Sequence, residues 1–281
     1  MTTLVTGAGG QLGRSTVRAF MNFDKVVGLA RADLDVTDRD GVHAAVAAHR
    51  PSVVVNCAGW TDVDGCELDP ELAHLANAQA PGFLREACEE VDAHLVHIST
   101  DFVFDGARDE PYSENCSTGP LNVYGATKLE GESAAGPLAT VVRTSWLQDS
   151  AGPNMVDRVL DGLAGVGELT FPGDRQSTPS FSDDVARVVR RLAAERHPGV
   201  VHAANGGVTS WADFARLVAN EVGDDAERIQ ATSEADYDTP RPAHRPRYSA
   251  LDNTVLRDLG RSPMRHHRDV VIEILDRLRV G

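Results

Sequence analysis

Tyr124 and Lys128 lie four residues apart, and this spacing is the pattern in the sequence that most directly suggests chemistry. On an α-helix, side chains at i and i+4 project from one face, one turn apart. An ammonium group beside a phenol favours the phenolate and lowers the phenol pKa from about 10 toward working pH. Such a phenol can exchange a proton with an oxygen of a bound substrate. A surface helix with a tyrosine and a solvated lysine is the alternative interpretation.

A glycine-rich turn near the N-terminus has the form of a diphosphate-binding loop. The short apolar run Thr2–Thr6 is followed by Gly7, Gly10 and Gly13, and apolar residues then recur at helical spacing. The first glycine permits a tight turn, the second lets the backbone approach a phosphate, and the third lets the helix pack against the strand. Free N–H groups at the helix start would face the diphosphate. A plain tight turn is the alternative, but the strand-to-helix context favours nucleotide binding.

The end of the next expected strand bears on the choice of dinucleotide. Residues 25–30 are typical of a strand, and Ala30 and Arg31 stand where an acidic residue would favour NAD. Arginine suits a 2′-phosphate, so the sequence favours NADPH, with NADH possible and a solvated surface arginine as the alternative. Asp35 and Val36 follow in a loop near the expected position of the adenine.

Two further apolar runs, residues 51–57 and 94–99, are typical of buried parallel strands and end in residues suited to ligand contact. The first run is followed by Ala58, Gly59 and Trp60. Ala58 and Gly59 are small enough to let a cofactor lie across the strand end. Thr100 and Asp101 follow the second run, at the edge where open parallel sheets bind ligands. Thr100 is a candidate to hydrogen-bond a substrate carbonyl oxygen, although a Ser-Thr-Asp cluster is also typical of a helix or turn cap.

The alternation of strands and helices predicts an α/β fold with a Rossmann-type parallel sheet and helices on both faces. We expect residues 1–147 to form an NAD(P)-binding domain that carries the catalytic residues. Residues 148–281 are expected to form a smaller, mainly substrate-binding lobe, part of which returns to the sheet. The elements expected in this second part are helices at 154–164, 182–195, 211–222 and 266–279 and strands at 168–172 and 199–203.

Three connecting segments carry specific expectations. Residues 70–91 are predicted to be helical, with a break near Pro81. Residues 102–120 form a long polar loop, typical of a flap over a site. Residues 239–249 are rich in proline and arginine. They are either a linker or an ordered wall whose arginines offset the charge of a phosphorylated substrate.

Composition narrows the class of partner. A net charge of −15 argues against nucleic acid and against an anionic membrane. No apolar stretch approaches about 18 residues, so we expect no membrane span. The four cysteines have neither metal-finger nor redox spacing. Reduced thiols, a cytoplasmic location and no metal site are therefore expected.

These segments together resemble the extended short-chain dehydrogenase/reductase superfamily, whose members carry the glycine turn, a Ser or Thr after the fourth strand and a Tyr-x-x-x-Lys pair. Within it the chain is most similar to the dTDP-4-dehydrorhamnose reductase family, essentially from end to end. The stretches that carry the similarity are residues 56–64, 99–106, 120–132, 143–146, 173–179 and 245–251. The Ser-Thr-Asp-x-Val-Phe stretch and the C-terminal Arg-Pro stretch are far more specific than the glycine turn.

The resemblance implies roles for individual residues. Tyr124 would protonate the C4 oxygen, Thr100 would hold that oxygen, and Lys128 would bind the nicotinamide ribose and tune the phenol. The cofactor-binding residues, from the motifs and the resemblance together, are Gly7, Gly10, Gln11, Leu12, Gly13, Ala30, Arg31, Asp35, Val36, Ala58, Gly59, Trp60, Tyr124 and Lys128. The implied substrate-binding residues are Val63, Thr100, Asp101, Tyr124 and Trp146.

The implied activity is NADPH-dependent reduction of the C4 ketone of a dTDP-sugar, a dTDP-4-keto-6-deoxyhexose. The first candidate substrate is dTDP-4-dehydro-L-rhamnose, whose reduction gives dTDP-L-rhamnose. Another substrate of that class, a non-catalytic regulatory subunit on the same fold, and an epimerase or dehydratase are the alternatives. Some members dimerise through magnesium bound by glutamates, one of them at the position of Ser15 here. We therefore predict neither that metal nor that dimer, while another homodimer stays possible. Residues 176–180 depart from the family pattern, so the substrate loop is expected to differ.

Overall fold

A six-stranded parallel sheet forms the centre of the computed structural model, which describes residues 1–23, 25–237 and 241–280. The strand order is β2-β1-β3-β4-β5-β9. The strands are β1 (Thr2–Thr6), β2 (Lys25–Leu29), β3 (Val53–Asn56), β4 (His94–Thr100), β5 (Thr140–Thr144) and β9 (Gly199–His202). All five pairings within this sheet are parallel, so the carboxyl ends of the strands meet at one edge. The predicted Rossmann-type sheet is confirmed.

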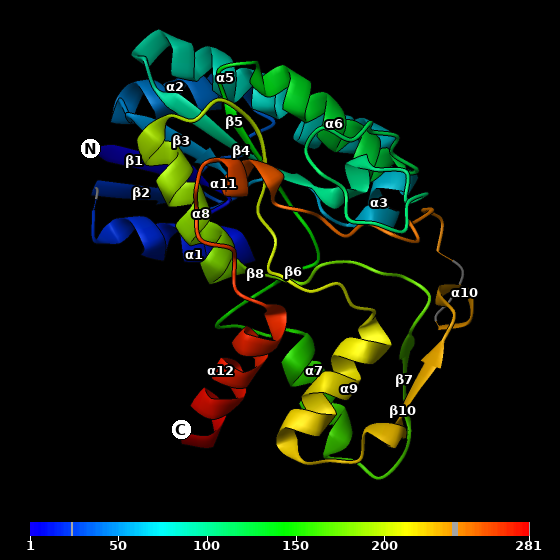
Figure 1. The fold of residues 1–281 in the computed structure, drawn as a ribbon. Coiled ribbons are helices and arrows are strands. Elements are labelled where there is room, and N and C mark those ends of the chain that lie inside the picture. Colours follow the sequence, from blue (N-terminus) through cyan, green and yellow to red (C-terminus); the bar gives the residue numbers. More distant parts are fainter. Residues whose placement is uncertain (24, 238–240, 281) are drawn as a thin grey trace.

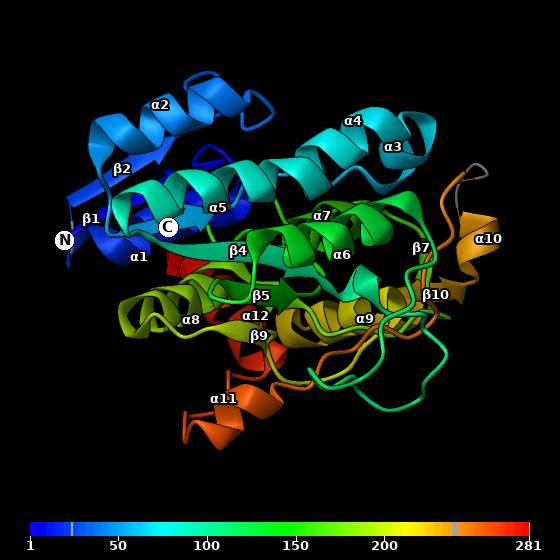
Figure 2. The same cartoon turned by 90° about the horizontal axis from the view of Figure 1, so that it is seen from above.

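Helices cover both faces of this sheet, as Figures 1 and 2 show. One face packs against α1 (Gln11–Met21) and α8 (Ser182–Glu195), and the other against α2 (Arg39–His49), α5 (Ala80–Val91) and α6 (Val123–Ala135). The strands are apolar along their length because side chains on both faces are covered. In β3, for example, every residue is buried.

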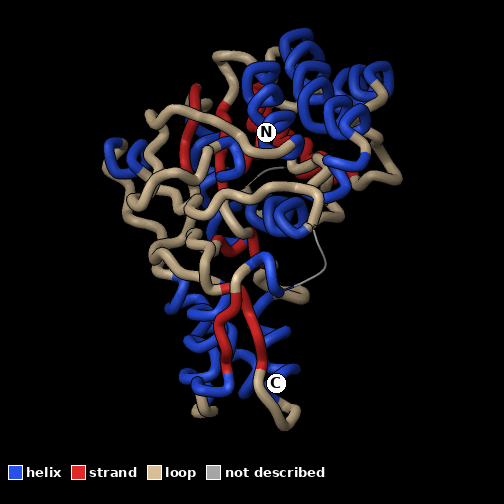
Figure 3. The backbone as a smooth tube through the Cα atoms, turned by 90° about the vertical axis from the view of Figure 1, so that its right-hand side faces the viewer, coloured by secondary structure: helices blue, strands red, loops and turns tan. Residues whose placement is uncertain are grey.

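A narrower C-terminal lobe extends below the sheet (Figures 1 and 3). It consists of α7 (Met155–Leu163), α9 (Trp211–Val222), α12 (His267–Val280), η3 (Ala226–Arg228) and the paired strands β7 (Leu169–Pro172) and β10 (Ile229–Thr232). Its core contains Phe171, Phe181 and Phe214. The short strands β6 (Leu147–Gln148) and β8 (Ser180–Phe181) pair where the chain first enters and first leaves it.

After β8 the chain returns to the sheet. It adds α8 and β9, enters the lobe again for α9, η3 and β10, and comes back with α11 (Thr254–Asp258), which packs against β9. The remaining short helix, α10 (Glu234–Tyr237), follows β10. The division of the chain at residue 147 stays a prediction. No helix among residues 1–23, 25–237 and 241–280 has the length and apolar character needed to cross a membrane.

Residues 63–91 differ from the expected broken helix. After α3 (Val63–Leu68), the elements α4 (Pro70–His74), the π-helical turn η1 (Leu75–Gln79) and α5 follow one another without interruption. The prediction of a break near Pro81 is wrong. Proline lacks an N–H and its ring crowds the carbonyl four residues earlier, which here belongs to Asn77. The wider π turn places that carbonyl against Gly131 of α6, where a Cβ would lie 2.1 Å from it.

The expected flap at 102–120 is an anchored loop rather than a free one. It begins with the 3₁₀ turn η2 (Asp101–Val103). Phe104 and Tyr112 are buried, and their rings stack with centroids 4.2 Å apart. The Tyr112 N–H donates to the Ala250 carbonyl over 2.8 Å. This loop is therefore fixed to the C-terminal segment that follows the proline-rich stretch.

The described part of the proline-rich stretch, residues 241–249, forms an ordered wall and not a linker. Arg245 is nearly buried and pairs with Asp64 of α3 over 2.5 Å. Arg241 and Arg175 both pair with Glu234, over 3.0 and 3.2 Å. Each of these three arginines thus has a carboxylate partner, but together they share two carboxylates, so one positive charge remains in excess. Residues 239 and 240 of the predicted stretch lie outside the described residues.

Candidate active site

A cleft of about 490 Å³ opens at the carboxyl ends of β1, β2 and β3. The predicted cofactor-binding residues that line it are Gly7, Gly10, Ala30, Arg31, Asp35, Val36, Ala58, Gly59 and Trp60. Sequence reasoning missed the rest of its lining, which is Gly9, Ala32, Leu34, Thr37, Cys57, Leu72 and Ala76. The size, the position at a sheet edge and the glycine-rich wall suit the adenosine and diphosphate of a dinucleotide.

The glycine turn is built by close backbone packing. Gly7 has a φ of +63°, and a Cβ there would lie 2.7 Å from the Ala58 nitrogen. A Cβ on Gly13 would lie 2.1 Å from the Gly7 carbonyl oxygen. Gly10 is the N-cap residue of α1 and brings no side chain to that helix start. The backbone N–H groups of the first turn therefore stay open to an anion in the cleft.

Two residues expected to meet the diphosphate differ in how they are placed. Gln11 is exposed, whereas the Leu12 side chain is buried in the core between α1 and the sheet. Any contact from Leu12 to a diphosphate would therefore use its backbone N–H.

Thr100 and Tyr124 meet although they come from different elements. Asn122 caps α6 by accepting a hydrogen bond from the Gly125 N–H over 2.7 Å, which fixes the start of the helix. Tyr124 is buried, its ring meets Phe102 edge-on at 5.8 Å, and it lies close enough to Thr100 for that hydroxyl to affect its pKa. The predicted Val63 packs against the same small apolar cluster as Tyr124. The structure thus brings a phenol and a hydroxyl to the carboxyl end of β4.

The expectation that Lys128 lowers the pKa of Tyr124 is wrong for this structure. Burial raises the pKa of the Tyr124 phenol, and the neighbouring Thr100 hydroxyl lowers it only in part. The neighbouring Asp101 carboxyl raises it further. A buried phenol without a charged partner keeps its proton, so Tyr124 is here a neutral acid and not a phenolate.

Lys128 lies one turn further along α6, and its amine is turned toward β4. Nζ donates to the Ile98 carbonyl over 2.6 Å and lies 3.5 Å from Nε2 of His97. Burial lowers the pKa of Lys128 to about 8, while Glu132 and Cys57 act in the opposite direction. A Cβ built on Gly59 would lie 3.8 Å from Nζ, so the amine also borders the wall of the cleft.

Asp101 is a buried carboxyl group surrounded by hydroxyls. It accepts hydrogen bonds from Thr100 over 3.1 Å and from Ser145 over 3.0 Å. Burial raises the pKa of Asp101, against the effect of these hydroxyls and of Arg175. Asp101 therefore contacts Thr100 directly, and the two predicted substrate-binding residues lie together.

Trp146, the other predicted sugar contact, is held on the lobe side. Its ring stacks on Trp211 with centroids 5.7 Å apart. Its φ of 38° is a left-handed conformation that residues other than glycine rarely adopt. Such outliers concentrate at ligand sites, and Trp146 directly follows the Ser145 that bonds Asp101.

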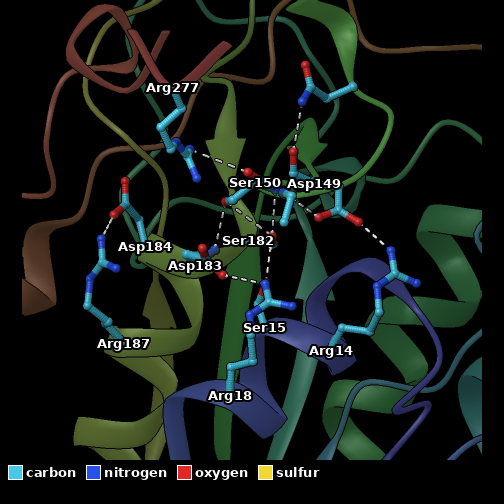
Figure 4. A network of polar contacts seen from close by, with 12 residues as sticks. Arg14, Ser15, Arg18, Asp149, Ser150, Ser182, Asp183, Asp184, Arg187 and Arg277 are labelled. Carbon is cyan, nitrogen blue, oxygen red and sulfur yellow. Dashed lines mark hydrogen bonds and ion pairs between the residues drawn. The ribbon is translucent and has the colours of Figure 1, made fainter. Parts of the chain in front are cut away.

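Ser15, at the position of the family glutamate, is buried between α1 and α8. Its hydroxyl donates to Ser182 over 2.8 Å. Figure 4 shows it within a network in which the start of α1 and the start of α8 meet Asp149 and Ser150. Within residues 1–23, 25–237 and 241–280, no group of three or more His, Cys, Asp or Glu side chains could hold a metal ion.

Sequence reasoning missed two further buried polar residues, one beside the cleft and one at the end of β5. Asn77, on the π turn, accepts from the Trp60 N–H over 2.8 Å and donates to the Trp60 carbonyl over 3.0 Å, so it fixes that loop. The Thr144 hydroxyl is buried and has no partner among the described residues, at the end of β5 in register with Thr100. The sequence features that could have indicated them are the position of Asn77 four residues before Pro81 and that of Thr144 at the end of an expected strand.

Comparison with known proteins places the chain in a family. Residues 1–280 match the family described as the RmlD substrate binding domain. The chain belongs to this family.

Curated relatives cover nearly the full chain. A probable dTDP-4,6-dihydroxy-2-methyloxan-3-one 4-ketoreductase of Streptomyces antibioticus is 41% identical over 97% of this chain and 94% of its own length. A dTDP-4-dehydrorhamnose reductase of Mycolicibacterium smegmatis is 40% identical over 95% of this chain and 83% of its own length.

Solved structures agree. The crystal structure of a dTDP-4-dehydrorhamnose reductase from Clostridium acetobutylicum is 36% identical with a TM-score of 0.93, covering 99% of this chain and 100% of its own. A dTDP-4-dehydrorhamnose reductase from Bacillus anthracis, solved in complex with NADP, is 29% identical with a TM-score of 0.91, covering 98% of both chains.

Proposed function

We propose that this RmlD-family protein uses NADPH to reduce the C4 ketone of a dTDP-4-keto-6-deoxyhexose, with dTDP-4-dehydro-L-rhamnose as the first candidate. The observation that carries the proposal is that Thr100 and Tyr124 lie together at the carboxyl end of β4, with Lys128 one turn along α6, beside a dinucleotide-sized cleft. The relatives named as reductases of such sugars, and the relative solved with NADP, support it.

The cleft offers a fit for the cofactor. The open start of α1 suits the diphosphate, and Arg31, exposed at the end of β2, suits a 2′-phosphate. The Lys128 amine borders the cleft wall at Gly59, where it would contact the nicotinamide ribose of a bound cofactor. NADPH, when bound, supplies the hydride.

The proton comes from the protein. Tyr124 holds its proton because its buried environment raises its pKa, so it can deliver that proton to the C4 oxygen. Thr100 now donates to Asp101 and accepts from the Phe102 N–H. To hold the ketone oxygen, Thr100 turns its single hydroxyl hydrogen from Asp101 to the substrate, which stabilises the charge that develops there.

Relatives of this chain are named for different sugars of the proposed substrate class. One relative at 41% identity is named as a 4-ketoreductase of dTDP-4,6-dihydroxy-2-methyloxan-3-one, and another at 36% as a dTDP-4-keto-6-deoxy-D-glucose reductase. A second substrate of the same class is therefore the alternative.

The test is to mix the purified protein with NADPH and dTDP-4-keto-6-deoxyglucose, with and without a 3,5-epimerase. We expect stoichiometric NADPH oxidation, and NMR of the product gives the substrate and the C4 configuration. Oxidation only with the epimerase identifies the rhamnose route. Tight NADPH binding without turnover on any dTDP-4-keto sugar would overturn the proposal in favour of a non-catalytic protein.

A further inference from the structure

A buried chain of polar contacts runs beneath the cleft and ends at Lys128. Thr6 donates to Oδ1 of Asn56 over 2.7 Å, and the Ala58 N–H donates to the same oxygen over 3.1 Å. Nδ2 of Asn56 lies 3.1 Å from Nδ1 of His97, and Nε2 of His97 lies 3.5 Å from Nζ of Lys128. The chain therefore crosses β1, β3 and β4 and reaches α6. The Thr6, Asn56, His97 and Lys128 side chains are all buried.

The direction of each hydrogen bond follows from one backbone group. The Ala58 N–H can only donate, so the amide oxygen of Asn56 faces Ala58 and its NH₂ faces His97. Nδ1 of His97 must then accept, which places the single ring proton on Nε2. An imidazolium would set an N–H against the Asn56 NH₂, and burial accordingly holds the pKa of His97 well below its usual range.

This arrangement turns an N–H toward the lysine amine. A Lys128 ammonium has only donors, so it finds no acceptor at Nε2, whereas a neutral amine offers a lone pair there. We propose that His97 is a positioning residue that favours the neutral amine of Lys128 and leaves the Ile98 carbonyl as the acceptor on β4 for the ammonium when it forms. Its effect on catalysis rests on the proposed reductase function.

The other groups that face the amine do not replace this effect. Glu132, one turn further along α6, already accepts from Arg143 over 2.8 and 2.7 Å and from Ser99 over 2.5 Å. Burial raises the pKa of the Cys57 thiol to about 12, and Tyr124 is neutral for the same reason. His97 is thus the neutral neighbour whose Nε2–H group can bond to the neutral amine of Lys128 but not to its ammonium form.

The chain offers a direct measurement, because Lys25 and Lys128 are its only lysines. Lysine labelled with ¹³C at Cε gives two signals, and the exposed Lys25 serves as the internal reference. We expect Lys128 in the wild-type protein to titrate near pH 8, where burial places its pKa. In His97→Asn the new amide oxygen still accepts from Asn56, but no N–H faces the amine. The Lys128 midpoint is then expected to rise by about one pH unit.

The matched control is His94→Asn, which removes a buried histidine of the same strand that contacts Thr140 over 2.8 Å and not Lys128. It should leave the Lys128 midpoint in place. An unchanged midpoint in folded His97→Asn, or an equal shift in both variants, would overturn the proposal. Neither result depends on turnover, so the reductase assignment is tested separately.

If His97→Asn does not fold, the wild-type protein still decides the matter. In a long-range ¹H–¹⁵N spectrum of histidine-labelled protein, the imidazole assigned to His97 should stay in the Nε2–H form across pH 5.5 to 9, roughly the range over which an ordinary histidine would titrate. An Nδ1–H form, or a titrating ring assigned to His97, would refute the proposal. With an active enzyme, the alkaline limb of kcat/KM should move with the Lys128 midpoint, whereas a merely structural role would lower kcat without moving it.

Discussion

At the scale of single residues, the environment of Tyr124 decides its chemistry more than its sequence neighbour does. Burial and the nearby Asp101 keep the phenol protonated, while the Lys128 amine is held at the Ile98 carbonyl. A reduction requires a proton donor at the ketone oxygen, so this state is the one the proposed reaction needs. The spacing found the pair, but only the fold shows that burial, and not the other member of the pair, dominates the pKa of each group.

Tyr124→Phe should therefore remove the acid and preserve the packing. The phenyl ring keeps its edge-on contact with Phe102, so we expect a folded protein that still binds NADPH. Turnover should fall by about 10²- to 10⁴-fold, the usual contribution of a positioned acid. NADPH oxidation with a dTDP-4-keto sugar measures the loss, and NADPH fluorescence titration checks binding. Near wild-type turnover in this variant would show that Tyr124 is not the proton donor.

The residues that sequence reasoning missed have a common property. Asn77 and His97 act through contacts with the Trp60 loop and with Lys128, which lie 17 and 31 positions away in the chain. Their sequence neighbourhoods are ordinary helix and strand. Only the pairing of β3 with β4 and the packing of α6 against the π turn bring them to the site.

At the scale of elements, α6 is positioned by glycines that allow backbone contact. A Cβ on Gly125, directly after Tyr124, would lie 2.1 Å from the Phe102 carbonyl oxygen. Gly131 makes the same kind of contact with Asn77 one and a half turns later. The helix that carries Tyr124 and Lys128 is therefore held close to η2 at one point and to η1 at the other.

Gly125→Ala should shift this helix. The added methyl group meets backbone rather than a flexible side chain, so we expect a loss of about 1–3 kcal/mol in the free energy of unfolding. Activity should fall by more than NADPH binding, because Tyr124 moves with the helix. Gly82→Ala in α5 is the control, since its Cβ would make an ordinary 3.6 Å contact with Ala134. Urea unfolding and turnover of both variants test this, and equal stability of the two would contradict it.

Periodicity predicted most elements well, including α8 and α9 with their observed bounds. It failed at residues 75–79, because hydrophobic spacing does not distinguish an α turn from a π turn. It also left residues 241–249 undecided. Their order comes from pairs such as Arg245 with Asp64, which are 181 residues apart in the chain.

At the scale of the whole molecule, the network in Figure 4 ties the sheet to the segment that leads into the lobe. Arg14 donates to the Gly9 carbonyl in the cleft wall over 2.6 Å and pairs with Asp149 beyond β6. One turn later, Arg18 pairs with Asp183 of α8 over 2.8 Å. The two arginine side chains are equally exposed, at 46%, but the Asp149 side chain is 2% exposed and that of Asp183 is 36%.

This contrast gives a matched pair of variants. Arg14→Gln leaves a buried carboxylate without its cation and should cost about 1–3 kcal/mol in the free energy of unfolding. Arg18→Gln removes a pair in which both side chains are at least 36% exposed, and it should cost under about 1 kcal/mol. Chemical denaturation of both variants at one pH measures the difference. A larger loss for Arg18→Gln would show that burial of the acidic partner does not govern the strength of these contacts.

Buried histidines predict how the whole protein responds to acid. Burial lowers the pKa of His94 and of His202 from 6.5 to about 4. Because the folded pKa lies below the unfolded one, their contribution to stability is complete above pH 6.5 and is lost as the pH falls toward 4. The loss should amount to roughly 3 kcal/mol for each residue.

The unfolding free energy should therefore fall between pH 6.5 and 4, and the double variant His94→Gln/His202→Gln should show a shallower fall. Glutamine takes up no proton when the double variant unfolds, so these two positions no longer contribute to the slope of the unfolding free energy against pH. His49→Gln, at an exposed position at the end of α2, is the control and should keep the wild-type slope. Guanidinium unfolding at half-unit pH steps gives the three curves. Parallel curves for the wild type and the double variant would mean that other groups, such as the carboxylates of the arginine pairs, carry the acid response.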